Sequence, residues 1–418
     1  MGIASYLIVT FFAFAVPRSA VAEEWSPQLL ADRAEAQHPS LAAQRDQIRA
    51  LRERARVAGA WPDPMVGFEV SNLPVSTFTL DDHPMSGLQF RVEQTLRPPG
   101  WSRLRREHSE TLVQVASWGQ DEHAVQLRAH VRTAWWELVR TRQLGTLMER
   151  QLERTRDVLE LLRPRLSAGT GAQAALLRLE LLRDQLDDAL SDVATREAAL
   201  LASLRSAVGE PLETLDTPTR TAPKALPRVD APREHATVDR PAIQQKQAEE
   251  DAAQRQKQLA RREALPDVRL WAGYRLRQFE SPTDTGVDFV SIGLGVPIPV
   301  SRARTGRAAR NAALAEASRS QNAREALLDE IAASWTAVSA EWSRAYAKAL
   351  NHDERLIPAA QAILDAVRSD FTVGRAEVSD LLDAEVALIE LERARVHAAI
   401  ATHLLNVRAF ALFGKDVS

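Results

Sequence analysis

The sequence contains no cysteine, which excludes disulfide bonds, thiolate metal sites, cysteine nucleophiles and a lipid-bearing N-terminal cysteine. The formal net charge is only −3, so no basic surface indicates a nucleic-acid partner and no acidic tail indicates disorder. Motifs for a serine nucleophile or a phosphate-binding loop are also absent, and the nine histidines are scattered. We therefore predict no enzyme active site, no metal site and no cofactor, and we expect His397 and His403 to be surface or packing residues of a helix.

The N-terminus contains an apolar run, Ile3 to Val16, followed by the small residues Ala20-Val21-Ala22. This pattern predicts a secretory signal peptide over residues 1–22, cut after Ala22. No Lys or Arg precedes the run, and a buried N-terminal helix is the alternative. No other window approaches the ~18 apolar residues of a membrane-spanning helix. Any part of the mature chain that enters a membrane is therefore expected to do so as strands.

The chain resembles itself when it is shifted by about 205 residues. From Arg163 and Arg368 onward the two copies align without a gap, and Gly169 aligns with Gly374. We predict two structural repeats, 23–209 and 238–418, joined by a proline-rich connector at residues 210–237.

Each repeat is predicted to contain a helix, two strands, a very long helix, a turn and a last helix. The first helix of each repeat is expected at Pro27–Gly59 and Asp239–Glu263, and the long helices at Trp101–Ala168 and Arg302–Val373. Helices of that length need other helices beside them, in an extended bundle or coiled coil. Pro164 and Pro358 are expected to kink or loosen them.

The strand segments alternate strictly between apolar and polar residues. In "LQFRVEQTL", for example, Leu88, Phe90 and Val92 occupy one face and Gln89, Arg91 and Glu93 the other. Two hairpins packed on a helical layer would show the same alternation. The long helices offer no broad layer, however, and strands of this length suit a membrane barrel. Four strands cannot close a barrel, so we expect several chains to share one. The predicted fold class is mainly α with a membrane β part.

Two segments resemble the helix-hairpin tips of the outer membrane efflux proteins, the TolC-like family. They are "FTVGRAEVSDLLDAEVALIELE" from Phe371 and "LSAGTGAQAALLRLELL" from Leu166. The resemblance covers essentially the whole mature chain. It implies a homotrimer with a shared outer-membrane β-barrel in lipid and a long α-helical tunnel across the periplasm. It also implies partners, namely a periplasmic adaptor (membrane fusion) protein and an inner-membrane RND-type pump.

The resemblance also assigns residues. Asp380 and Asp383 match the aspartates that ring and constrict the tunnel entrance in the family, and two carboxylates three residues apart share one helix face. The adaptor-contacting tips would be Ala168-Gly169-Thr170 and Val373-Gly374-Arg375. A solvated helix face is the alternative for the two aspartates.

The segments "PDPMVGFEVSN" and "LQFRVEQTLRPPGWSRLRRE" resemble the heavy-metal subgroup of the family, which exports cobalt, zinc, cadmium, copper or silver. The expected function is an exit duct of a tripartite efflux system for heavy-metal cations. Multidrug efflux, type I protein secretion and a soluble periplasmic coiled-coil scaffold are the alternatives.

Overall fold

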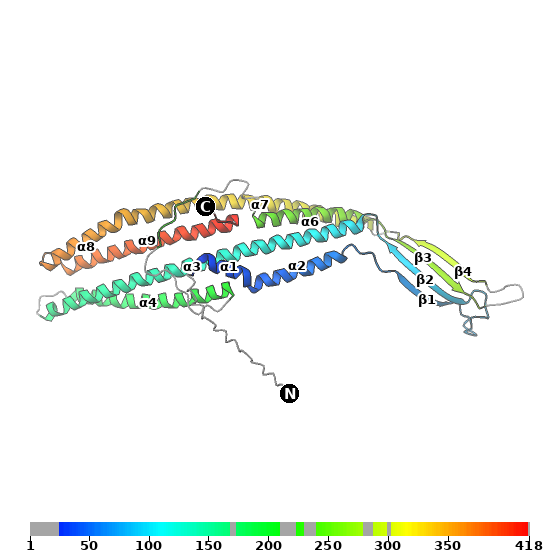
Figure 1. The fold of residues 1–418 in the computed structure, drawn as a ribbon, viewed down its shortest axis with the longest axis horizontal. Helices are drawn as coiled ribbons and strands as arrows, with labels where there is room; N and C mark the ends of the chain where they lie inside the picture. Colours follow the sequence, from blue (N-terminus) through cyan, green and yellow to red (C-terminus); the bar gives the residue numbers. More distant parts are fainter. Residues whose placement is uncertain are drawn as a thin grey trace, which may run out of the picture.

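The computed structural model describes residues 25–167, 173–209, 223–229, 240–278, 287–298 and 302–416. The protein is a long, slender body of helices with a small twisted sheet at one end (Figure 1). The predicted signal peptide and most of the predicted connector lie outside the described residues, as does the first predicted tip.

The first half of the chain contains the elements that the repeat predicts. Their bounds are α1 Pro27–Gln37, α2 Pro39–Val57, β1 Met65–Ser71, β2 Gly87–Leu96, α3 Trp101–Ser167 and α4 Gln173–Val208. At ~1.5 Å per residue, the 67 residues of α3 extend over about 100 Å. The prediction of one continuous helix over Pro27–Gly59 is wrong at His38, because Pro39 disfavours helical backbone in the residue before it and His38 has ψ 129°.

The second half repeats this order. Its elements are α6 Pro241–Glu263, β3 Val268–Leu276, β4 Phe289–Gly295, α7 Arg302–Asn351, a π-helical turn at His352–Leu356, α8 Ile357–Thr372 and α9 Val378–Phe413. The π turn lies just before Pro358, as expected where a missing N–H loosens the helix, whereas α3 continues through Pro164. Helices α4 and α9 both have 36 residues, and each ends at a glycine with positive φ, Gly209 or Gly414.

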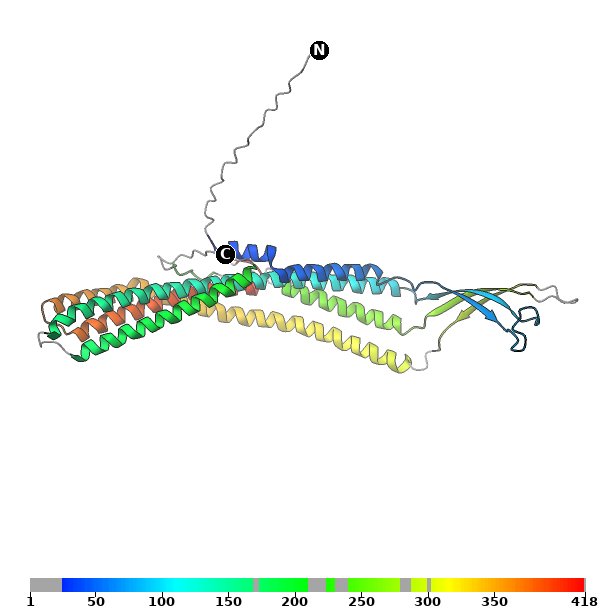
Figure 2. The ribbon, with the colours of Figure 1, turned by 90° about the horizontal axis from the view of Figure 1, so that it is seen from below.

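The four strands form one antiparallel sheet in the order β1-β2-β3-β4. Strand β2 of the first half pairs with β3 of the second, so the sheet joins the two halves. Seen from below, α7 diverges from α6 toward the sheet (Figure 2). The sheet and the turn between α8 and α9 are at the two far ends of the molecule (Figure 1).

The main core lies midway along the helices. Trp135, Val131 and Leu138 of α3 are buried there against α1, α4 and α9. Of the helices in the described ranges, only α9 is long and apolar enough to cross a membrane. The prediction that no segment beyond the N-terminal run has such a composition is therefore wrong. The most apolar window of α9 is 61% buried inside the protein, which is typical of a core helix.

The described part of the connector, residues 223–229, is fixed to this core by side chains from two helices. Trp342 of α7 donates its indole N–H to the Leu226 carbonyl at 2.9 Å, and Leu226 donates its amide N–H to Thr402 of α9 at 2.9 Å. His403 donates to the Lys224 carbonyl at 2.9 Å and stacks on Trp136, with 3.8 Å between ring centroids. His403 is thus a packing residue, as expected.

We expect the connector to loosen in acid. Burial lowers the pKa of His403 from its ordinary value of 6.5, against a smaller opposing effect of its bond to Lys224. The folded protein therefore holds His403 neutral, and as pH falls through about 6.5 the unfolded chain takes up a proton first, so stability falls. The melting temperature should fall between pH 7.5 and pH 5.5.

The matched substitutions are His403→Gln and His130→Gln, since His130 is exposed on α3. His403→Gln should reduce the pH dependence and His130→Gln should leave it unchanged. Part of the dependence will remain in both, because burial also lowers the pKa of His108 and of His397. Equal pH dependence in the two variants would contradict the prediction.

Candidate functional site

The second predicted tip is a tight turn between α8 and α9. Gly374 has φ +75°, a backbone conformation that other residues rarely adopt, and its N–H donates to the Phe371 carbonyl. The Arg375 and Ala376 amides both donate to the Asp370 carbonyl, at 2.8 and 3.3 Å. These bonds satisfy the last carbonyl groups of α8, so the glycine predicted as a helix reversal is one. Val373 and Arg375 are exposed beside it.

Asp380 has a structural role that the sequence analysis missed. It occupies the third position of α9, and its carboxylate accepts the Glu377 amide N–H at 2.9 Å, while the Glu377 side chain accepts the amide of Asp380. This reciprocal arrangement is a capping box, which stabilises the first turn of a helix. The signal was in the sequence, as an acidic residue three positions after Glu377, but capping boxes usually begin with Ser or Thr.

Asp383 makes no hydrogen bond or ion pair within the described ranges, and both aspartates are exposed in the single chain. Helix α9 buries Leu381, Glu385 and Leu388 instead. The two carboxylates therefore lie on a side of α9 that the chain itself does not cover. The first predicted tip, Ala168, Gly169 and Thr170, lies outside the described residues.

The hairpin is closed behind the tip by an ion pair across the two helices. Arg368 of α8 donates to the carboxylate of Glu385 of α9 at 2.7 Å, and the Glu385 side chain is only 9% exposed. Phe371 is buried beside this pair, together with Leu364 and Leu381. Neither the ion pair nor the burial of Phe371 follows from local sequence, because the contacts join residues on different helices.

We predict that Arg368→Ala loosens the hairpin. The substitution leaves the Glu385 carboxylate nearly buried without its cation, which costs about 1–3 kcal/mol. Amide hydrogen exchange of residues 364–388 should become faster. Arg375→Ala is the matched control, because Arg375 is exposed at the turn and has no ion pair in the described ranges. Unchanged exchange after Arg368→Ala would contradict this role.

The sheet exposes its apolar face. Val66, Phe68 and Ile292 are 74%, 61% and 82% exposed, while Gln89 on the other face is 7% exposed. Register explains the arrangement, since Val66, Val92, Ala272 and Ile292 face one another across the four strands. A sheet in water would bury this face, so the pattern indicates an apolar surrounding.

Paired side chains cover the polar face. Arg91 lies over the Trp271 ring at 4.4 Å, and Arg275 donates to Gln89 at 2.8 Å. Gly293 leaves room for the Trp271 ring, because a Cβ at position 293 would lie 2.3 Å from it. The strands β1 and β4 are the two edges of the sheet, and neither has an outer partner among the described strands.

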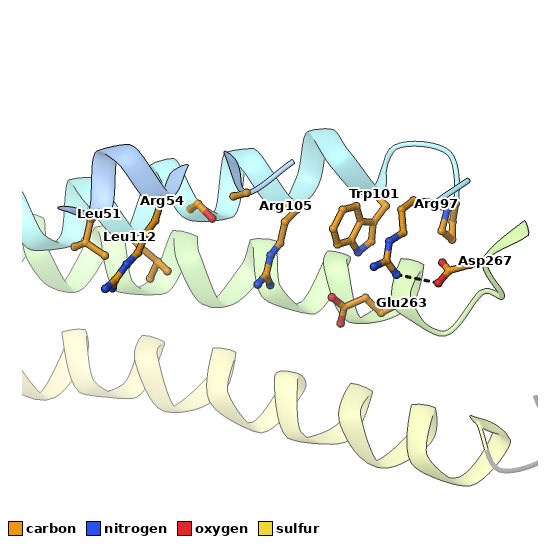
Figure 3. Close-up of a pocket in the computed structure, with 11 residues that line it drawn as sticks. Leu51, Arg54, Arg97, Trp101, Arg105, Leu112, Glu263 and Asp267 are labelled. Atoms are coloured by element: carbon orange, nitrogen blue, oxygen red, sulfur yellow. Dashed lines mark hydrogen bonds and ion pairs between the residues drawn. The ribbon is translucent and has the colours of Figure 1, made fainter. Parts of the chain in front are cut away.

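A cavity of about 710 Å³ lies where the sheet joins the helices, on the polar side. Figure 3 shows its labelled side chains, among them Trp101 and Arg105 of α3 and the ion pair of Arg97 with Asp267. Arg54 and Glu263 also line it. The described part of the chain contains no group of three or more His, Asp or Glu side chains that could hold a metal ion. The cavity is therefore a polar surface of mixed charge.

Outer-membrane channel subunits have such a body of long helices with a small sheet at one end. Solved structures of that class share the fold. The outer-membrane channel OprN has a TM-score of 0.75 and 17% identity, and the match covers 93% of this chain and 89% of OprN. The outer membrane protein VceC of Vibrio cholerae has a TM-score of 0.72 and 18% identity, over 94% and 97% of the two chains. The MtrE outer membrane channel of Neisseria gonorrhoeae, solved in an open state, has a TM-score of 0.71 and 18% identity, over 94% and 89%.

Residues 233–407 match the family described as outer membrane efflux protein. The match covers less than half of the chain and supports the resemblance seen in the sequence. No curated protein sequence matches the chain. The family match and the shared fold are both those of outer-membrane efflux channels, which are transport proteins.

Proposed function

We propose that three copies of the chain form a closed exit duct. The exposed apolar face of the sheet together with its two unpaired edges carries the proposal. An unpaired strand edge is not tolerated in hydrocarbon, because its N–H and C=O groups have no partners there. Pairing of β4 of one chain with β1 of the next removes both edges and directs the polar face into the lumen. The helices then continue the lumen into the periplasm.

The tips would form the periplasmic entrance. In a trimer, Asp380 and Asp383 repeat around the axis and form two adjacent rings of carboxylates, which attract cations. The turns at Ala168-Gly169-Thr170 and Val373-Gly374-Arg375 would contact a periplasmic adaptor, and an RND-type inner-membrane pump would supply the energy. The exposure of Asp383, Val373 and Arg375 supports this assignment.

We infer that the substrate is a heavy-metal cation, because the segments that begin at Pro62 and Leu88 resemble the heavy-metal subgroup of the family. A duct that conducts passively needs no tight metal site, and selection would then belong to the pump. Multidrug efflux and type I secretion use the same kind of duct and are the competing substrates.

The proposal is tested first by fractionation and crosslinking. The mature protein should require detergent for release, crosslink as a trimer and form conducting channels in planar bilayers. Release by osmotic shock without detergent would overturn the duct and favour a periplasmic scaffold. Deletion of the chain should then sensitise cells to cobalt, zinc, cadmium, copper or silver. Sensitivity to dyes and detergents alone would favour multidrug efflux.

A further inference from the structure

An apolar groove lies at the junction of sheet and helices, on the outward side. It has a volume of about 700 Å³, and Trp61, Leu96, Leu265 and Val268 line it together with several prolines. Leu96 and Val268 face each other across β2 and β3 and lie on the apolar face of the sheet. The groove is therefore continuous with the surface that the proposed function places in the membrane.

A basic cavity adjoins this groove on the helical side. It has a volume of about 440 Å³, shares Gly100, Arg103 and Leu265 with the groove, and is also lined by Arg261 and Arg262 of α6. No carboxylate is among the described residues that line it. Within the described ranges, Arg103 has one ion pair, with Glu107 at 3.4 Å, and the Arg103 side chain is 80% exposed. Arg261 and Arg262 are exposed and have no ion pair in the part of the chain that the structure describes.

The polar side of the same junction differs in its charge. Trp101 and Arg105 lie on the opposite face of α3 from Arg103, and the cavity there also contains Glu263 and Asp267 (Figure 3). The Arg97 guanidinium is neutralised by Asp267 at 2.9 Å. The cavity on the polar side therefore contains both arginines and carboxylates, whereas the described lining of the outward cavity contains arginines alone.

We propose that the groove and the basic cavity bind one anionic phospholipid of the periplasmic leaflet per chain. The groove accommodates an acyl chain, and Arg103, Arg261 and Arg262 bind the phosphate. Arginine suits this role because its planar fork of N–H donors matches phosphate oxygens. Trp61, 53% exposed, lines the apolar groove, and membrane proteins place aromatic side chains at the membrane interface. The site rests on the membrane placement of the sheet given above.

The order of chemistry along the chain supports this orientation. The groove begins at the apolar strand ends Leu96 and Val268, and the arginines lie beyond it on α3 and α6, as headgroups lie beyond hydrocarbon in a leaflet. A free phosphate ion would use only the basic cavity and leave the apolar groove without an occupant.

The test compares phospholipid retention by wild type and three variants. Detergent-purified trimer is incubated with an equal mixture of phosphatidylglycerol and phosphatidylcholine, and bound lipid is counted by native mass spectrometry. Wild type should retain phosphatidylglycerol preferentially. The triple substitution Arg103→Gln, Arg261→Gln, Arg262→Gln should lower this preference by about tenfold or more, because each arginine near an anionic lipid contributes about fivefold.

The control removes the same charge far from the sheet, as Arg150→Gln, Arg156→Gln, Arg196→Gln on α3 and α4. All three arginines are exposed. The control should keep the wild-type preference, and Leu265→Gln should lower retention of both lipids. Equal preference for phosphatidylglycerol in wild type and triple variant would overturn the site. Dissociation of the triple variant into monomers would overturn it as well, because it would mean that a second copy of the chain covers the groove. Conductance of the wild-type protein is recorded in parallel. If the channel conducts but shows no lipid preference, the lipid site is refuted and the proposed exit duct is not.

Discussion

Ile292→Arg is expected to abolish insertion of the protein into the outer membrane. Ile292 is 82% exposed in the middle of β4, on the apolar face that we assign to lipid. A cationic side chain there costs roughly 2–4 kcal/mol per chain near the centre of a bilayer, and each copy in the barrel contributes the same penalty. The measurement is the amount of protein in the outer-membrane fraction of a density gradient.

The adjacent substitution Ser291→Arg is the matched control. Ser291 precedes Ile292 in the same strand, is also exposed, and lies on the polar face opposite Gly273. The same arginine should be tolerated there, since the lumen of the proposed barrel is hydrated. Equal loss from both substitutions would contradict the orientation of the sheet, and normal insertion of Ile292→Arg would contradict its contact with lipid.

The elements that local patterns determine were predictable from the sequence. The alternation in "LQFRVEQTL" fixed both faces of β2, and the long three-to-four periodicity fixed α3 to within one residue at its end. Gly374 was recognisable as a reversal because few other residues adopt its φ. The helix break at His38 was missed although Pro39 favours it. Proline is common in the first turn of a helix, and its presence does not tell whether another helix ends just before it.

The contacts that join distant segments were not predictable. The bonds of Thr402 and His403 to the connector span more than 170 residues of sequence, and no local pattern marks Leu226 and Lys224 as their respective partners. The pairing of Arg368 with Glu385 likewise depends on how α8 and α9 pack. For the candidate entrance, the sequence predicted the carboxylates but not that Asp380 caps its helix.

The capping role of Asp380 determines how the entrance has to be tested. Alanine at this position would remove both the charge and the bond to the Glu377 amide, and loss of such a cap costs about 0.5–2 kcal/mol. A change in conductance could then come from a disordered turn. Asparagine keeps an oxygen that accepts the same N–H and removes only the charge.

Asp380→Asn combined with Asp383→Asn is expected to reduce the preference of the channel for cations on the order of tenfold and to weaken block by multivalent cations. In the trimer, the double substitution removes both carboxylate rings from the narrow entrance, where the field of like charges is concentrated. The measurement is the reversal potential and cation block of single channels in planar bilayers under a salt gradient. Asp188→Asn with Asp192→Asn removes the same number of exposed carboxylates from α4 and should leave both properties unchanged. Equal effects of the two pairs would show that the net charge of the tunnel, and not a ring at Asp380 and Asp383, determines its selectivity.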